Sequence, residues 1–184
     1  MTATEQLRAE HEGIRLMLRI LEKYCAKLEG GEAVDPEDGE RMVEFIRVFA
    51  DRCHHEKEEG LLFPSMERHG IPREGGPIGV MLHEHEAGRA FVRGMVEALE
   101  KFRGGDKGAG SAFVENARGY IQLLSAHIEK ENQVLFPMAD MRLTAGEQTE
   151  LAEAFETVET EKIGAGKHEE FHALLDRLRE IYLG

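Results

Sequence analysis

Apolar residues recur along this chain at alternating spacings of four and three, which is the pattern of helices that bury one face in a bundle. Four long stretches show it, separated by short loops: residues 4–28, 35–64, 78–102 and 111–140. Thr4 is the expected N-cap of the first helix, and Pro64 is expected to kink or end the second. No stretch alternates with the period of a strand, so the pattern predicts an all-α protein.

The short connections between these helices favour an up-down-up-down four-helix bundle, which we assign to residues 1–141. Two shorter helical patterns follow, at about 144–162 and 168–183, with a Gly-Ala-Gly segment between them. They predict a helical C-terminal extension over residues 142–184 that packs on the bundle.

Composition narrows the class of protein. Hydrophobic residues make up 41% and charged residues 32% of the chain, as in soluble globular proteins, and the net charge is −13. No basic face accompanies this acidic balance, which disfavours nucleic-acid binding. The N-terminus lacks a signal-peptide pattern, and no apolar run reaches the roughly 18–20 residues of a membrane helix, so a cytoplasmic protein is expected. Cys25 and Cys53 fall within apolar patterns and are expected to be buried thiols.

Histidines and glutamates interrupt the apolar stripes. Four of the nine histidines and two glutamates occupy inner positions: His11, His54, Glu58, His85, His127 and Glu131. Residues four apart share a helix face, so His54 pairs with Glu58 and His127 with Glu131.

These residues belong to an internal repeat. The pattern H-E-x-x-R begins at His11 and again at His85, while H-x3-E-x3-L-F-P begins at His54 and again at His127. Each half of the chain is therefore a helix with one histidine followed by a helix with a histidine and a glutamate. Antiparallel pairing of the helices would bring both sets together midway along the bundle.

Burying two carboxylates without a partner is very costly, and no Lys or Arg stands at the matching inner positions. A pair of divalent or trivalent cations would neutralise them. Glu58 and Glu131 would bridge the two metals, the histidines would cap them about two per metal, and open positions would remain for a small ligand. Imidazole and carboxylate suit iron, and also manganese or zinc, while the lack of thiolate disfavours a structural zinc site.

The twin H-x3-E-x3-L-F-P and H-E-x-x-R segments resemble the hemerythrin-like HHE cation-binding family over roughly residues 1–140. The resemblance implies a non-haem di-iron centre in a four-helix bundle. It also implies that His11 and His85 are ligands from the single-histidine helices, that His54 and His127 complete the histidine set, and that Glu58 and Glu131 bridge the irons.

One departure separates this chain from the oxygen-carrying hemerythrins. Those proteins have two histidines one turn apart on the third helix and an aspartate near the final histidine, whereas here Met81 and Arg89 flank His85 and Asn132 stands in the aspartate's place. The pattern is closer to bacterial relatives linked to nitric-oxide or oxidative stress and to iron-centre repair.

Three functions agree with this pattern. The first is binding or sensing of a small oxidant, namely dioxygen, peroxide or nitric oxide. The alternatives are a di-iron enzyme that reduces peroxide or nitric oxide, and iron storage or delivery to damaged iron centres. The sequence does not indicate an oligomeric state.

The other histidines are weaker candidates for metal ligands. His168 and His172 form an H-E-x-x-H pattern, but only Asp176 and Glu180 follow as a third ligand for a zinc protease, and a ferritin-type site would need two E-x-x-H motifs inside the bundle. A solvated helix face is therefore expected, and the alternative is that His168 or His172 lies near the metal or its access route. His55 and His83 neighbour inner residues on other helix faces, which favours surface or supporting roles over direct ligation. Arg15 and Arg89 are expected to pair with Glu12 and Glu86.

Overall fold

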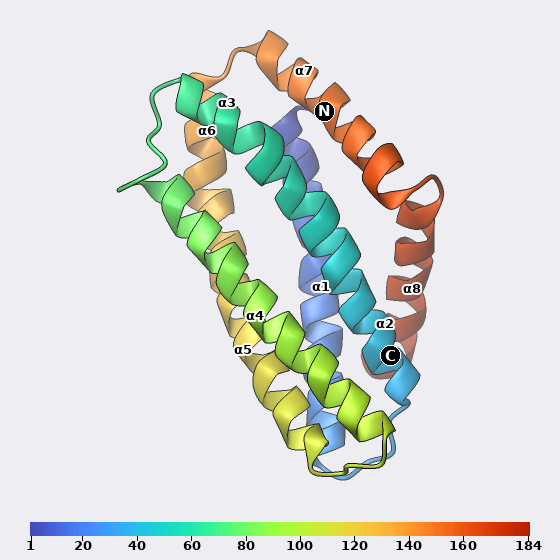
Figure 1. The fold of residues 1–184 in the computed structure, drawn as a ribbon. Coiled ribbons are helices and arrows are strands. Elements are labelled where there is room, and N and C mark those ends of the chain that lie inside the picture. The colour runs from blue at the N-terminus through green and yellow to red at the C-terminus, as the bar shows by residue number, and fades with distance from the viewer.

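The computed structural model describes residues 1–184 as helices joined by short loops, with no strand. Four long helical segments run side by side, and successive segments point in opposite directions (Figure 1). The up-down-up-down bundle expected from the sequence is therefore confirmed. None of its helices combines the length and the apolar character that a membrane-spanning helix requires.

The first segment, α1, spans Ala3–Glu29. Its N-cap is Thr2 rather than Thr4, because Thr2 and Glu5 form a reciprocal capping box one residue before the first turn. Thr4 is buried inside that turn, and its hydroxyl donates a hydrogen bond to Asp140.

The second segment is continuous from Pro36 to Arg68 and alternates between α-helical and π-helical geometry. It comprises α2 (Pro36–Phe45), η1 (Ile46–His55), η2 (Glu58–Leu62) and α3 (Phe63–Arg68). Pro64 does not end it: in η2 the N–H of Phe63 bonds to the carbonyl of Glu58, five residues back. This wider turn gives the proline ring room, so the helix continues to Arg68.

The third segment is α4 (Pro77–Arg103), and the fourth comprises α5 (Ala109–Lys130), η3 (Glu131–Leu135) and α6 (Phe136–Arg142). The fourth segment contains the same kind of π-helical turn as the second: the N–H of Phe136 bonds to the carbonyl of Glu131, and Pro137 follows. Both π-helical turns begin at a glutamate of the internal repeat. Single π-helical turns are frequent at functional sites.

A layer of buried polar residues divides the hydrophobic core in two. The larger cluster lies toward one end of the bundle and contains Ile14 and Leu124, while the smaller lies toward the other end and contains Leu7 and Leu135. On α1, His11 stands between Leu7 and Ile14, and the other long segments place their polar residues at the same level. The polar layer is thus closed from water by apolar packing on both sides.

The C-terminal helices lie along the outside of α1 and the second segment (Figure 1). They are α7 (Ala145–Val158), η4 (Glu159–Ile163) and α8 (Lys167–Tyr182), and Thr144 caps the first of them. Side chains of α8 join the larger core and those of α7 the smaller: Phe171, Leu175, Leu178 and Tyr182, and Leu151 and Phe155.

Because α8 shares the core, its apolar residues should contribute to the stability of the whole chain. Leu178→Ala is expected to lower the free energy of unfolding by about 2–5 kcal/mol, since it leaves a cavity at a fully buried position. Ile181→Ala, at a position that is 50% exposed on the same helix, should cost less than about 0.5 kcal/mol. Urea denaturation followed by circular dichroism measures both; equal effects would show that α8 is not part of the cooperative core.

Candidate metal centre

The six residues singled out in the sequence converge in the polar layer from all four long segments. Each is almost wholly excluded from solvent, with at most 1% of its surface exposed. Together with His55, their side chains form two clusters in which the donor atoms lie within 4.8 Å of one another: His11, His54, Glu58 and Glu131 in the first, and His55, Glu58, His85 and His127 in the second.

The two glutamates connect these clusters. Glu58 belongs to both, and one of its oxygens lies 3.4 Å from Nε2 of His54 while the other lies 3.4 Å from Nε2 of His85. Glu131 places Oε2 at 3.1 Å from Nε2 of His11 and Oε1 at 3.0 Å from Nε2 of His127. Each carboxylate therefore spans the gap between the clusters, as a bridging ligand would.

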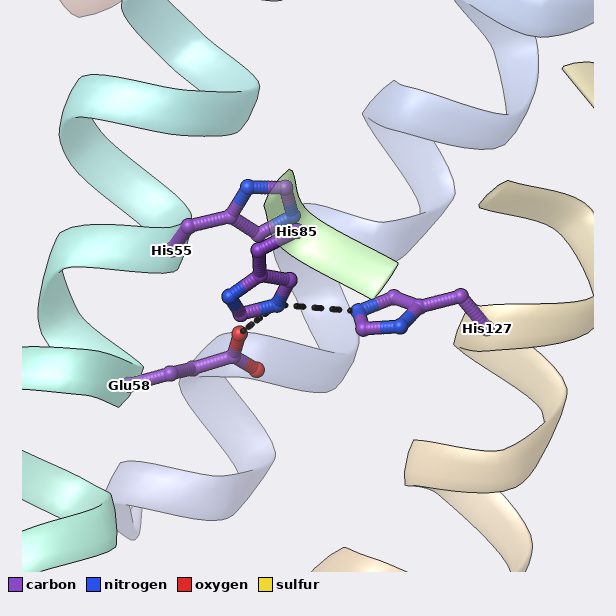
Figure 2. A group of neighbouring side chains, drawn as sticks. All are labelled: His55, Glu58, His85 and His127. Carbon is purple, nitrogen blue, oxygen red and sulfur yellow. Dashed lines mark hydrogen bonds and ion pairs between the residues drawn. The ribbon is translucent and has the colours of Figure 1, made fainter. Parts of the chain in front are cut away.

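Six of the inward-facing atoms lack hydrogen bonds. All four carboxylate oxygens of Glu58 and Glu131 are buried without a hydrogen-bond partner, as is Nε2 of His11 and of His54, because the short contacts between them are poorly aligned. On the other side, Nε2 of His85 faces Nε2 of His127 at 3.1 Å (Figure 2). Buried polar atoms are rarely left in this state. A cation between them would satisfy the whole set, so these residues fit a dinuclear metal site.

A second set of side chains holds the histidine rings in place from outside. The Nδ1 atom of His54 lies 2.7 Å from Glu10, that of His127 2.8 Å from Glu84, and that of His85 2.7 Å from Glu59. His11 makes the equivalent contact with Asn132 at 2.8 Å. These partners fix each ring so that Nε2 points inward, as carboxylates do for metal-bound histidines.

These partners were not singled out from the sequence, although the repeat contains them. Glu10 and Glu84 directly precede His11 and His85, and Glu59 and Asn132 directly follow Glu58 and Glu131. Each therefore supports a histidine from a neighbouring segment rather than from its own. Asn132, which marks the departure from oxygen carriers, occupies the position that Glu59 has in the first half.

The L-F-P motif also contributes to the site. The ring of Phe136 stacks on His11 at 5.4 Å between centroids, and that of Phe63 lies parallel to His85 at 6.1 Å. Both phenylalanines are fully buried. They cover the histidines on the side of the smaller core and keep water from them.

His55 corrects the interpretation made from the sequence. It is not a surface residue: it is buried, its ring stacks on His85 with centroids 3.8 Å apart, and it belongs to the second cluster (Figure 2). The π-helical geometry of η1 changes which residues share a face, so a count based on a regular α-helix assigned His55 to the wrong side. The internal repeat did not indicate an inward histidine at position 55 either, because the corresponding residue in the second half is Ile128. His83 is exposed, as expected.

The histidines and carboxylates of the site shift one another's pKa. Burial alone would lower the pKa of His54, but Glu58 and Glu10 raise it to about 10, and Glu131 and Glu84 raise that of His127 to about 10 in the same way. Burial and Glu58 would raise the pKa of Glu131, but the facing histidines lower it to about 2. Protons on imidazole thus balance the buried carboxylates, and a bound cation would displace them.

Lys57 is a second correction, because a lysine does lie inside the bundle. Its side chain is fully buried and its ammonium binds Glu10 and, at 2.6 Å, Glu159 of η4. It therefore neutralises Glu10 and Glu159, which form a small group with Cys53, and not Glu58 and Glu131. Its repeat counterpart Lys130 binds Glu84 but keeps 43% of its side chain exposed.

The remaining sequence candidates lie apart from the two clusters. The rings of His168 and His172 contact each other on α8, and the ring centroid of His168 lies 5.4 Å from that of Phe49. Arg15 and Arg89 pair with Glu12 and Glu86 as expected, and each also binds a more distant carboxylate, Glu129 in one case and Asp51 in the other.

Comparison with known families decides the assignment. Residues 2–139 match the hemerythrin HHE cation binding domain. The chain belongs to this family. Among curated proteins, the hemerythrin domain chain is similar to uncharacterized proteins of Mycobacterium tuberculosis and Mycobacterium bovis, with 24% identity over 181 residues that cover 98% of this chain and 69% of each relative. No solved structure matches it. The family, the buried clusters and the unsatisfied donor atoms together agree with a dinuclear cation site.

The two repeat-related lysines allow a matched test of the outer network. Lys57→Met should lower the free energy of unfolding by about 3 kcal/mol or more, because it leaves buried Glu10 without its cation. Lys130→Met removes the equivalent contact where water screens it and should cost less than about 1 kcal/mol. Urea denaturation at equal metal loading compares the two, and similar losses would contradict the claim that burial makes the Lys57 contact the stronger one.

Proposed function

We propose that this hemerythrin domain holds two iron ions between Glu58 and Glu131 and binds or senses a small oxidant such as dioxygen, peroxide or nitric oxide. The observation that carries the proposal is the set of buried carboxylate and imidazole atoms that face one another without hydrogen bonds. His11 and His54 would bind one iron, and His85, His127 and His55 the other. Imidazole and carboxylate donors suit iron, and the same set would accept manganese or zinc.

The bound irons would supply a redox-active centre with positions open to a small ligand. The protein's own part is to hold the donors and to control access. The outer carboxylates fix the histidine rings, and Phe63 and Phe136 exclude water from the side of the smaller core. A surface pocket of about 230 Å³ reaches His55 and His85 and gives a small molecule a route to the second cluster.

The same route supports catalysis as the second candidate, in which the centre reduces peroxide or nitric oxide. Iron storage or delivery is less well supported, because every donor is buried and most histidines are held by an outer partner.

Anaerobic reconstitution with iron, followed by titration with dioxygen, peroxide and nitric oxide, separates these functions. A reversible spectral change supports binding, many turnovers support catalysis, and loss of iron to an apo acceptor supports delivery.

Metal content tests the site itself. Protein from iron-supplied cells is expected to contain two irons per chain, and Glu58→Gln should lower this below one, because Glu58 belongs to both clusters. Glu12→Gln, an exposed change beside His11, should leave two. Elemental analysis of purified protein gives these numbers. A wild-type chain with one metal or with zinc alone, or a Glu58→Gln variant with two irons, would contradict the proposal.

The role of His55 can be tested separately. His55→Ala is expected to weaken binding of one metal by at least about tenfold while the other binds as before, since His55 lies in only one cluster. His83→Ala, on an exposed helix face, is the control and should change neither. A stepwise metal titration resolves the two affinities, and unchanged binding by the His55→Ala variant would restrict His55 to supporting its neighbours.

A further inference from the structure

Arginines gather at the pocket that leads to the second cluster. The pocket lies between η1, α4 and α5, and four arginines line it: Arg47, Arg52, Arg89 and Arg93. The chain as a whole carries a net charge of −13, so this local concentration of positive charge is opposite in sign to the net charge of the protein.

The acidic residues of the same pocket do not neutralise it. Asp51 is bound by Arg89, with Nη2 at 2.8 Å and Nε at 3.0 Å from one carboxylate oxygen. Glu84 is bound by Lys130 and by the ring of His127. Both carboxylates are therefore already paired.

The three other arginines form no ion pair within the chain. Arg47 and Arg52 both belong to η1 and Arg93 belongs to α4, so two segments contribute arginines without an ion pair to the lining of one pocket. All three side chains are exposed to solvent, so their unpaired state costs the fold nothing and leaves their donors available.

The inner wall offers one more donor. Tyr120 of α5 lines the pocket with only 2% of its surface exposed, and its hydroxyl makes no hydrogen bond within the protein. Apolar side chains such as Ile46, Val92 and Leu124 line the pocket together with His55 and His85. A ligand here would meet cationic donors from the arginines and a neutral donor from Tyr120.

We propose that this pocket binds a small planar oxyanion of carboxylate-like geometry. Guanidinium groups present parallel N–H donors that match two oxygens of such an anion, and hydrogen bonds between charged groups are the strong ones. A volume of about 230 Å³ holds an anion of a few heavy atoms together with several waters. Anion binding rests on the arginines alone, whereas delivery of the anion to a metal rests on the proposed function.

Calorimetric titration with sodium formate, at ionic strength held constant with sodium chloride, tests the site. Wild-type protein is expected to bind one formate per chain, and the Arg52→Gln/Arg93→Gln variant should bind it at least about tenfold more weakly. Arg142→Gln removes an unpaired exposed arginine outside the pocket and should change the affinity less than about twofold. No saturable binding by the wild type, or an equal loss in the Arg142→Gln variant, would overturn the proposal.

Metal content measured on the same samples separates this site from the metal centre. It should be equal in wild type and in the Arg52→Gln/Arg93→Gln variant, because neither arginine belongs to a cluster. Tyr120→Phe should weaken formate binding about threefold or more through loss of one donor, also at unchanged metal content. Formate that binds only to metal-loaded protein, with equal affinity in wild type and in the double variant, would place the anion on the metal and overturn the proposal.

Discussion

Two carboxylates face each other in a layer of the bundle that water does not reach. Their negative charge determines which residues can surround them. Glu58 and Glu131 are fully buried, and none of their oxygens accepts a hydrogen bond. Removing such groups from water is costly unless opposite charge is close. The inward histidines supply that opposite charge when they are protonated, and the outer carboxylates hold their rings in place. The phenylalanines keep water away, which makes the requirement stricter. Apolar packing above and below keeps the layer dry, so neutralisation has to come from within it.

The two halves of the repeat surround the buried glutamates with different residues. In the first half, the C-terminal extension covers Lys57 and supplies Glu159 as its partner, while in the second half Lys130 stays at the surface. His55 gives the second cluster a third imidazole, whereas the first cluster has two. A surface pocket reaches His55 and His85 of the second cluster, and its lining includes no residue of the first.

Much of this arrangement could be predicted from the sequence, because helix periodicity and an internal repeat are local patterns. They indicated the bundle, which is confirmed, and they selected six residues that the structure does bring together. Four details differ from the expectations. Thr2 and Glu5 form the N-terminal cap in place of Thr4, the second segment continues past Pro64, His55 is buried rather than at the surface, and Lys57 lies inside the bundle. Regular α-helical geometry could not reveal the π-helical turn at Pro64 or the inward position of His55. The arginine pocket was also out of reach, since Arg52 and Arg93 meet only after two segments have packed.

The central claim is that two metal ions lie between Glu58 and Glu131. Anomalous diffraction at the iron edge from crystals of iron-loaded protein tests it most directly. The account predicts two peaks in the polar layer, about 3.5–4 Å apart, one beside His11 and His54 and the other beside His85 and His127. A single peak, or none between the two glutamates, would contradict it.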